Sequence, residues 1–212
     1  MLELSGIHIE AAGRVLVADL SARVAPGEVL AVMGDSGSGK STLLAYLCGT
    51  LAQGLSGRGG IRLFDIAIDQ LPTVRRRVAI LFQDDLLFPH LSVLENLLFA
   101  LPSGAAAERV ARAPAALADA GLAEHGRRMP HTLSGGQRAR VSVLRALLAQ
   151  PRALLLDEPF SRLDLPLRER FRAFVFERLR ALGIPAVLVT HDVHDVPPGA
   201  QVLQLSAEAD HV

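Results

Sequence analysis

The sequence predicts an α/β fold with a mostly parallel sheet, an N-terminal antiparallel β subdomain and an inserted α-helical subdomain. Short apolar runs, several of them ending in polar residues, alternate with segments of helical spacing, which is typical of a parallel sheet covered by helices. Residues 1 to about 28 read as β-rich. Residues from about 92 to 131 are rich in alanine and contain no strand candidate.

The length and composition fit one large domain. Half of the 212 residues are hydrophobic, which is enough for a substantial core. We expect a single domain over 1–212, in which about 1–91 and 132–212 form the α/β core with the β subdomain. The helical subdomain then covers about 92–131.

The elements follow from local patterns. The β subdomain is expected to contain strands Leu2–Ile9 and Arg14–Val24, followed by a turn at Pro26-Gly27. Four apolar runs predict the buried parallel strands: Val29–Met33, Val78–Phe82, Ala153–Asp157 and Pro185–Thr190. Helices are expected over Ser41 to about Leu51, from Ser92 with Glu95 in a capping box, from Ser134 to about Gln150, and over Pro166–Leu182.

Charge and cysteine content limit the possible partners and the compartment. The formal net charge is zero, so the composition indicates no basic face for nucleic acid. The three consecutive arginines at 75–77 are interpreted as a solvated helix end. The single cysteine, Cys48, lies in an apolar stretch and predicts a buried thiol in a reducing compartment. Neither a secretory leader nor a membrane span is recognised, so a cytoplasmic location is expected.

One motif surrounds the only lysine of the chain, Lys40. The pattern G-x-x-x-x-G-K-[ST] between a predicted strand and helix is a phosphate-binding P-loop and predicts a P-loop NTPase core. Its backbone N–H groups and the helix N-terminus attract phosphate, while a compact ammonium group contacts the phosphates. The residues of this predicted phosphate site are Gly34, Asp35, Ser36, Gly37, Ser38, Gly39, Lys40, Ser41 and Thr42.

Two adjacent acids, Asp157 and Glu158, follow the apolar run Leu154-Leu-Leu. A carboxylate at the end of a buried strand can reach a Mg²⁺ ion bound to phosphates, and Ser41 can ligate the same ion. A purely structural role as a helix cap explains two consecutive acids poorly.

A third motif identifies a family. The segment Leu133-Ser-Gly-Gly-Gln137 lies between the P-loop and the acidic strand, and its Ser134 can cap a helix. In this order the motifs resemble the ATP-binding cassette (ABC) family over nearly the whole chain. Gln83 is similar to that family's Q-loop, the segment Ser161–Asp164 to its D-loop, and His191 to its switch histidine.

The resemblance implies a chemistry. ATP and Mg²⁺ are the expected ligands, with Ser41, Gln83 and Asp157 near the metal. Glu158 resembles the general base, and His191, Gln83 and Lys40 resemble the residues that assist it. In the family two cassettes pair head to tail, so that the signature residues Ser134, Gly135, Gly136 and Gln137, together with Asp164, complete the ATP site of the other copy.

The segment after Gln83, up to Asn96, resembles that of bacterial importer ATPases, in which it grips the membrane subunit. Leu86, Leu87 and Phe88 are therefore expected either to contact a permease or to pack the helical subdomain. The implied partners are a second ATPase subunit, as a homodimer, transmembrane permease subunits and an extracytoplasmic solute-binding protein, without nucleic acid. The protein is then expected on the inner face of the membrane through its permease. The alternatives are an ABC exporter ATPase and an ABC ATPase outside transport.

Two further observations concern individual residues. Family members usually carry an aromatic ring for adenine between the first two strands, whereas residues 9–13 contain none, which predicts weak base selectivity. No role is predicted for the remaining histidines, which are His8, His90, His125, His131, His194 and His211.

Overall fold

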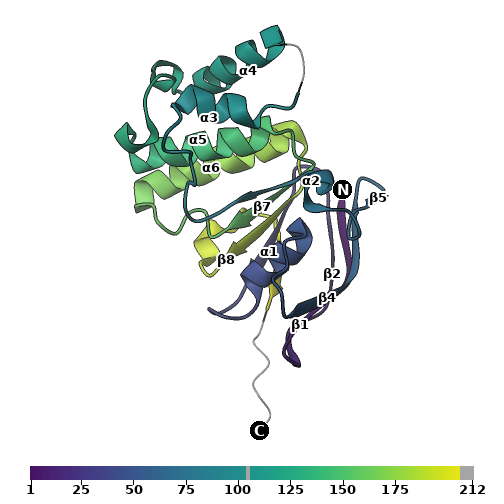
Figure 1. The fold of residues 1–212 in the computed structure, drawn as a ribbon. Helices are drawn as coiled ribbons and strands as arrows, with labels where there is room; N and C mark the ends of the chain where they lie inside the picture. Colours follow the sequence, from purple (N-terminus) through teal and green to yellow (C-terminus); the bar gives the residue numbers. More distant parts are fainter. Residues whose placement is uncertain (104–105, 206–212) are drawn as a thin grey trace. The chain divides into compact units, whose positions relative to one another are not determined.

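The computed structural model describes residues 1–103 and 106–205 (Figure 1). Two segments lie outside the described residues. The sequence analysis assigned residues 104–105 to the helical subdomain and residues 206–212, which include His211, to the core. The chain divides into two compact units. The core unit consists of Met1–Ile80, Arg152–Glu158 and Phe176–Val212, and the helical unit of Leu81–Pro151 and Pro159–Val175.

The N-terminal part of the core unit is an antiparallel sheet, as predicted. Its strand order is β2-β1-β4-β5, and β1 pairs antiparallel with both β2 and β4. The four strands are β1 (Leu2–Ala11), β2 (Arg14–Val24), β4 (Leu55–Leu63) and β5 (Ile66–Ala67). The predicted strands β1 and β2 are confirmed, with β1 two residues longer than expected.

Strand β4 was not predicted, because its glycines have low strand propensity. Packing explains why they are there. A Cβ on Gly57 would lie 2.5 Å from the Tyr46 ring, and a Cβ on Gly59 would lie 2.5 Å from the Gly6 carbonyl oxygen. The close approach of the neighbouring segments therefore requires glycine where local propensity argues against a strand.

The second sheet has the order β6-β7-β8-β3-β9, and β8 pairs in parallel with both β3 and β7. Its strands are β3 (Val29–Met33), β6 (Val78–Leu81), β7 (Ala153–Asp157), β8 (Ala186–Thr190) and β9 (Gln201–Gln204). The four predicted parallel strands are confirmed to within one residue at each end. β9 was not predicted, since it is only four residues long and contains only two apolar residues.

Helix α1 (Lys40–Cys48) follows the P-loop and belongs to one buried cluster with residues of both sheets. It ends earlier than the predicted Leu51, because Gly49 adopts φ 78° and closes it in the left-handed conformation. The other helical segments of the core unit are α2 (Thr73–Arg76) and η3 (Val193–Asp195).

The helical unit contains α3 (Val93–Ala100), α4 (Ala106–Asp119), η1 (Ala123–His125), η2 (Pro130–Thr132) and α5 (Gly135–Leu148). The long helix α6 (Leu165–Leu182) begins in this unit and ends in the core unit. A capping box forms at Ser92 with Glu95, as the sequence predicted, and Ser134 caps α5 as predicted, in a capping box with Gln137 that was not predicted. A buried cluster that includes Leu97, Leu117 and Val141 holds α3, α4 and α5 together.

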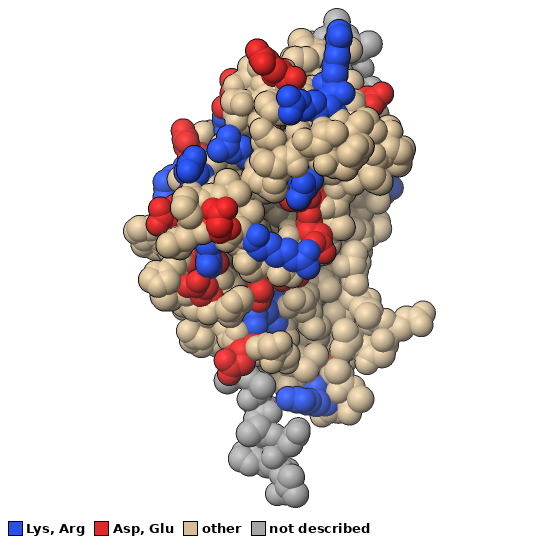
Figure 2. All heavy atoms as spheres, turned by 90° about the vertical axis from the view of Figure 1, so that its left-hand side faces the viewer, with Lys and Arg blue, Asp and Glu red and all other residues tan. Residues whose placement is uncertain are grey.

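Acidic and basic side chains are interspersed on the face drawn in Figure 2, which agrees with the zero net charge. No helix among the described residues is both long and apolar enough to cross a membrane.

Candidate nucleotide site

The P-loop joins β3 to α1 with backbone conformations that require glycine. A Cβ on Gly34 would lie 2.3 Å from the Leu205 carbonyl oxygen. Gly39 has φ 89°, and a Cβ there would lie 2.9 Å from the Leu16 carbonyl oxygen. The loop therefore keeps its curvature only with glycine at both ends.

The loop presents donors to an anion. Gly39 provides no side-chain cap, so the first-turn N–H groups of α1 are left for a ligand. Lys40 is only 6 % exposed, and its Nζ donates to the Gly34 and Asp35 carbonyl oxygens at 2.7 and 2.6 Å. The buried Ser38 Oγ has no hydrogen-bond partner among the described residues. This donor set fits a polyphosphate.

Ser41 and Asp157 meet beside the loop. The Ser41 hydroxyl donates to Asp157 Oδ1 at 3.2 Å. Burial raises the pKa of the Asp157 carboxyl and the neighbouring Glu158 adds to this, whereas the Ser41 hydrogen bond and Lys40 oppose it. Two oxygen donors beside a phosphate site suit Mg²⁺, which keeps several water and phosphate ligands. The described residues contain no cluster of three or more His, Cys, Asp or Glu side chains that could hold a metal.

Glu158 follows β7 in an unusual backbone conformation. Its φ is 46°, in the left-handed region that costs a non-glycine residue free energy and is often found at functional sites. Its Oε1 lies 3.1 Å from Nδ1 of His191, which is 60 % exposed at the end of β8. Behind the histidine, Thr190 donates to the buried Asp195 at 3.0 Å and fixes this turn. The pair Glu158 and His191 can therefore orient a water molecule at the sheet edge.

The predicted Q-loop and D-loop residues lie in the helical unit, where they contact each other. Gln83 Nε2 donates to Ser161 Oγ at 2.9 Å, and Asp84 forms an ion pair with Arg162. Asp164 accepts a hydrogen bond from the Leu167 N–H at 3.0 Å, in the first turn of α6.

The signature segment opens α5. Ser134 Oγ accepts from the Gln137 N–H at 3.3 Å, and Gln137 Oε1 accepts from the Ser134 N–H at 2.9 Å. A Cβ on Gly136 would lie 2.4 Å from the Leu167 side chain, so glycine there lets Leu167 of α6 pack closely against α5. The Gly135 N–H stands at the positive end of a 14-residue helix and suits an anion.

The structure therefore brings together the P-loop, Ser41, Asp157, Glu158 and His191 in the core unit. It places Gln83, Ser134–Gln137 and Asp164 in the helical unit.

The model of the family described as "ABC transporter" matches residues 17–161. The chain belongs to the ABC transporter family. It is an ATP-binding subunit and an ATPase coupled to transport.

Relatives support this assignment. The chain is 49 % identical over 209 residues to the uncharacterized ABC transporter ATP-binding protein YnjD of Escherichia coli, covering 97 % of this chain and 95 % of that protein. It is 43 % identical over 178 residues to the Fe(3+) ions import ATP-binding protein FbpC of Rhizobium etli, and 39 % identical over 194 residues to the putrescine transport ATP-binding protein PotG of E. coli. These two matches cover 83 % and 91 % of this chain but only about half of each relative, 50 % and 51 %.

A solved structure agrees with the fold. The dimeric ATP-binding cassette MJ0796 bound to ADP and Pi superposes with a TM-score of 0.78 at 28 % identity, over 99 % of this chain and 97 % of that one.

Sequence reasoning missed two buried polar side chains that shape this cassette. Arg76, expected on a solvated helix end, is 7 % exposed, and that expectation was wrong. Asn96 is fully buried on the apolar face of α3, where it accepts from the Phe88 N–H and donates to the carbonyl oxygens of Phe88, Leu91 and Ser92. A polar residue at a core-facing helical position is the signal that could have identified Asn96.

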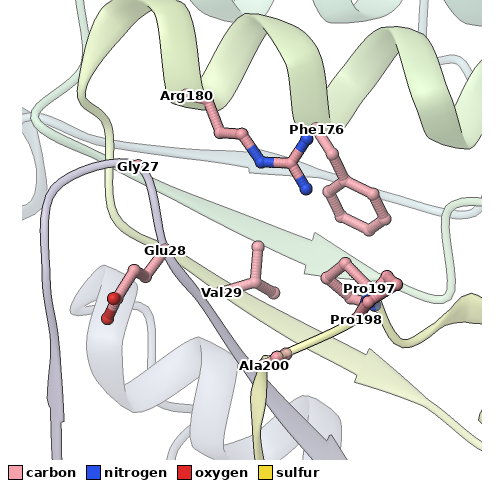
Figure 3. Close-up of a pocket in the computed structure, with 9 residues that line it drawn as sticks. Gly27, Glu28, Val29, Phe176, Arg180, Pro197, Pro198 and Ala200 are labelled. Atoms are coloured by element: carbon pink, nitrogen blue, oxygen red, sulfur yellow. The ribbon is translucent and has the colours of Figure 1, made fainter.

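Another hollow of the cassette, of about 170 Å³, lies away from these residues (Figure 3). Its walls include Val29, Phe176, Arg180 and Pro197, with the Arg180 guanidinium beside the Phe176 ring. Val29, which lines the hollow, is the first residue of β3, and the P-loop follows Met33, the last residue of β3. The hollow therefore lies at the end of β3 opposite to the phosphate site.

Proposed function

We propose that this chain is the ATPase subunit of a bacterial-type importer, and that it hydrolyses Mg²⁺-ATP within a head-to-tail homodimer. One observation carries the ATPase site. The strands β3, β8 and β7 are three neighbouring parallel strands of one sheet. The P-loop follows β3, His191 follows β8, and Asp157 ends β7, directly before Glu158. The carboxyl ends of parallel strands are where such sheets bind ligands.

The proposed reaction assigns one task to each side chain. Lys40 and the loop N–H groups bind the β- and γ-phosphates, and Ser41 and Asp157 would hold Mg²⁺, which neutralises charge on the phosphate oxygens. Glu158 accepts a proton from the attacking water while the oxygen of that water bonds to the γ-phosphorus. The bond from that phosphorus to the β,γ-bridging oxygen breaks, and ADP and phosphate leave. His191 orients Glu158 and donates to a γ-phosphate oxygen.

The homodimer is proposed because the signature end of α5 suits an anion, whereas the ATP of the same chain is bound at its P-loop. A second copy can offer Ser134 and the N–H groups of Gly135 and Gly136 to the same γ-phosphate. The solved cassette of this fold that is bound to ADP and Pi is dimeric, which supports a dimer for this chain.

Glu158→Gln tests the site. The amide keeps the shape but cannot accept the proton, so turnover should fall by about 10²–10⁴. ATP binding should survive, and an ATP-dependent dimer should accumulate in size-exclusion chromatography. Glu177→Gln, an exposed glutamate on α6, is the matched control and should hydrolyse ATP normally. Turnover of Glu158→Gln near the wild-type rate would contradict the assignment.

The importer function rests on the relatives and on one surface. The names of FbpC and of the spermidine/putrescine import ATP-binding protein PotA of Vibrio cholerae, 38 % identical over 197 residues, both include import. In the helical unit, Leu86 is 56 % and Phe99 68 % exposed, and Phe99 packs edge-on against Phe88 at 4.9 Å between ring centroids. We call Leu86, Phe88 and Phe99 the permease patch.

The buried contacts beneath the patch fix its shape. Asn96 holds the Phe88 backbone, and the Arg145 guanidinium lies 5.5 Å from the centroid of the Phe88 ring. Leu87, expected either to contact a permease or to pack the helical subdomain, packs against the buried cluster of this unit. The permease is therefore proposed to contact the patch without Leu87.

Leu86→Glu and Phe99→Glu test this surface. Each should abolish co-purification with the membrane permease and leave the basal ATPase rate unchanged. Val110→Glu is the control, because Val110 is an equally exposed apolar residue of the same unit, 62 % exposed on α4. Retained co-purification in both patch variants would place the permease elsewhere on the chain.

A further inference from the structure

One histidine without a predicted role contacts the signature directly. His125 Nε2 lies 3.0 Å from Gln137 Nε2. The other end of the Gln137 amide is already engaged, because its Oε1 accepts from the Ser134 N–H at 2.9 Å. The three residues therefore form a chain from His125 through the Gln137 amide to the N-cap of α5.

The hydrogen-bond roles along this chain are determined. Since Gln137 Oε1 accepts, its Nε2 must donate, and His125 Nε2 must accept with the ring proton on Nδ1. If Gln137 turned its amide over, its NH₂ group would face the Ser134 N–H and the capping box would be lost. The His125 lone pair thus selects the one amide orientation that also caps α5. His125 Nδ1 is buried without a hydrogen-bond partner among the described residues, so Nε2 makes the only ring hydrogen bond there.

The backbone around His125 is anchored on both sides. The His125 N–H donates to the Leu122 carbonyl oxygen at 2.9 Å, and its carbonyl oxygen accepts from the Arg128 N–H at 2.9 Å. The following residues are tied to the start of α3, where the Leu94 N–H donates to the Gly126 carbonyl oxygen at 2.9 Å. A ring on such a support holds Gln137 from outside α5.

We propose that His125 is a positioning residue of the ATPase: through Gln137 it holds Ser134 and the first N–H groups of α5 in the geometry that contacts the γ-phosphate of ATP bound to the second copy. This inference rests on the proposed head-to-tail dimer. His125 is not among the residues assigned to bind nucleotide or metal, so its effect should be confined to the ATP-dependent dimer and to turnover.

The test uses two substitutions of equal length. His125→Gln places a carbonyl oxygen where Nε2 stands and can accept from Gln137, whereas His125→Met has similar size and no comparable acceptor. Both are made in the Glu158→Gln chain, in which the ATP-bound dimer should accumulate. The ATP concentration for half-maximal dimerisation is measured by sedimentation, and binding of a fluorescent ADP analogue to the monomer reports the P-loop.

Loss of one hydrogen bond should weaken ATP-dependent dimerisation of His125→Met by roughly two- to tenfold. ADP-analogue binding should not change, and His125→Gln should restore dimerisation to within about twofold of the parent. If His125→Met does not fold, His125→Leu replaces it with the same expectation.

Equal dimerisation of His125→Met and the parent would overturn the inference, and so would a His125→Gln variant as weak as His125→Met. The proposed dimer is checked separately with the parent and with Ser134→Ala. If the parent does not dimerise with ATP, the dimer proposal fails and this inference falls with it. If Ser134→Ala weakens dimerisation but His125→Met does not, only the role of His125 is refuted.

Discussion

The stability of the P-loop helix should depend on a single buried guanidinium. Arg76 donates to four backbone carbonyl oxygens: those of Leu71, Tyr46, Leu47 and Asp69, at 2.9, 2.8, 3.0 and 2.6 Å. Two of these acceptors belong to the last turn of α1, the carbonyl oxygens of Leu47 and of Tyr46, and the latter also accepts from the Gly49 N–H at 3.0 Å. The cation also lies at the negative end of the helix dipole.

Arg76→Ala should lower the free energy of unfolding by about 4 kcal/mol, taking roughly 1 kcal/mol for each lost hydrogen bond. This is a large part of the roughly 5–15 kcal/mol that stabilises a typical domain. Arg76→Lys keeps the charge but not the planar fork and should lose about half as much.

Urea unfolding followed by circular dichroism measures the effect. The neighbouring Arg75 is exposed, and Arg75→Ala should change stability by no more than about 0.5 kcal/mol. An Arg76→Ala variant as stable as Arg75→Ala would refute the reasoning, since it would mean that water replaces the guanidinium at all four carbonyl oxygens.

Three further predictions concern the site and the core. Burial raises the pKa of Asp157, so the ionised carboxylate destabilises the folded state at pH values above that pKa. Asp157→Asn should therefore raise the free energy of unfolding at pH 7 but not at pH 3, and it should abolish Mg²⁺-dependent hydrolysis. Equal gains in the free energy of unfolding at both pH values, measured by urea unfolding, would contradict this. Burial also raises the pKa of the Cys48 thiol, so a thiol reagent should label native protein far more slowly than urea-unfolded protein, and equal labelling rates would show that Cys48 is accessible. Residues 9–13, which the family resemblance predicts to contact adenine, contain no aromatic ring. GTP should therefore compete within about tenfold of ATP, a difference of ~1.4 kcal/mol, and a preference above about a hundredfold in competition binding would indicate another base contact.

Much of the fold could be predicted because it rests on local patterns. The strands β3 and β7 are continuous apolar runs bounded by turn residues or acids. The helix caps Ser92 and Ser134 bond to residues only three positions along the chain. The P-loop, Asp157-Glu158 and the signature were recognisable for the same reason, since each motif is contiguous in sequence.

Tertiary structure decided the features that depend on distant neighbours. β4 forms in spite of its glycines because other segments approach it closely. Arg76 is buried because the carbonyl oxygens to which it donates come from the end of α1 and from the loop before α2. The contact between His125 and Gln137 joins residues 12 apart that no periodicity relates. The sequence by itself therefore determined the family and the chemical groups of the site, because phosphate chemistry requires contiguous backbone and fixed residue types. Only the tertiary structure decided which polar side chains are buried and what they hold, because burial and hydrogen bonding depend on segments that meet only when the chain is folded.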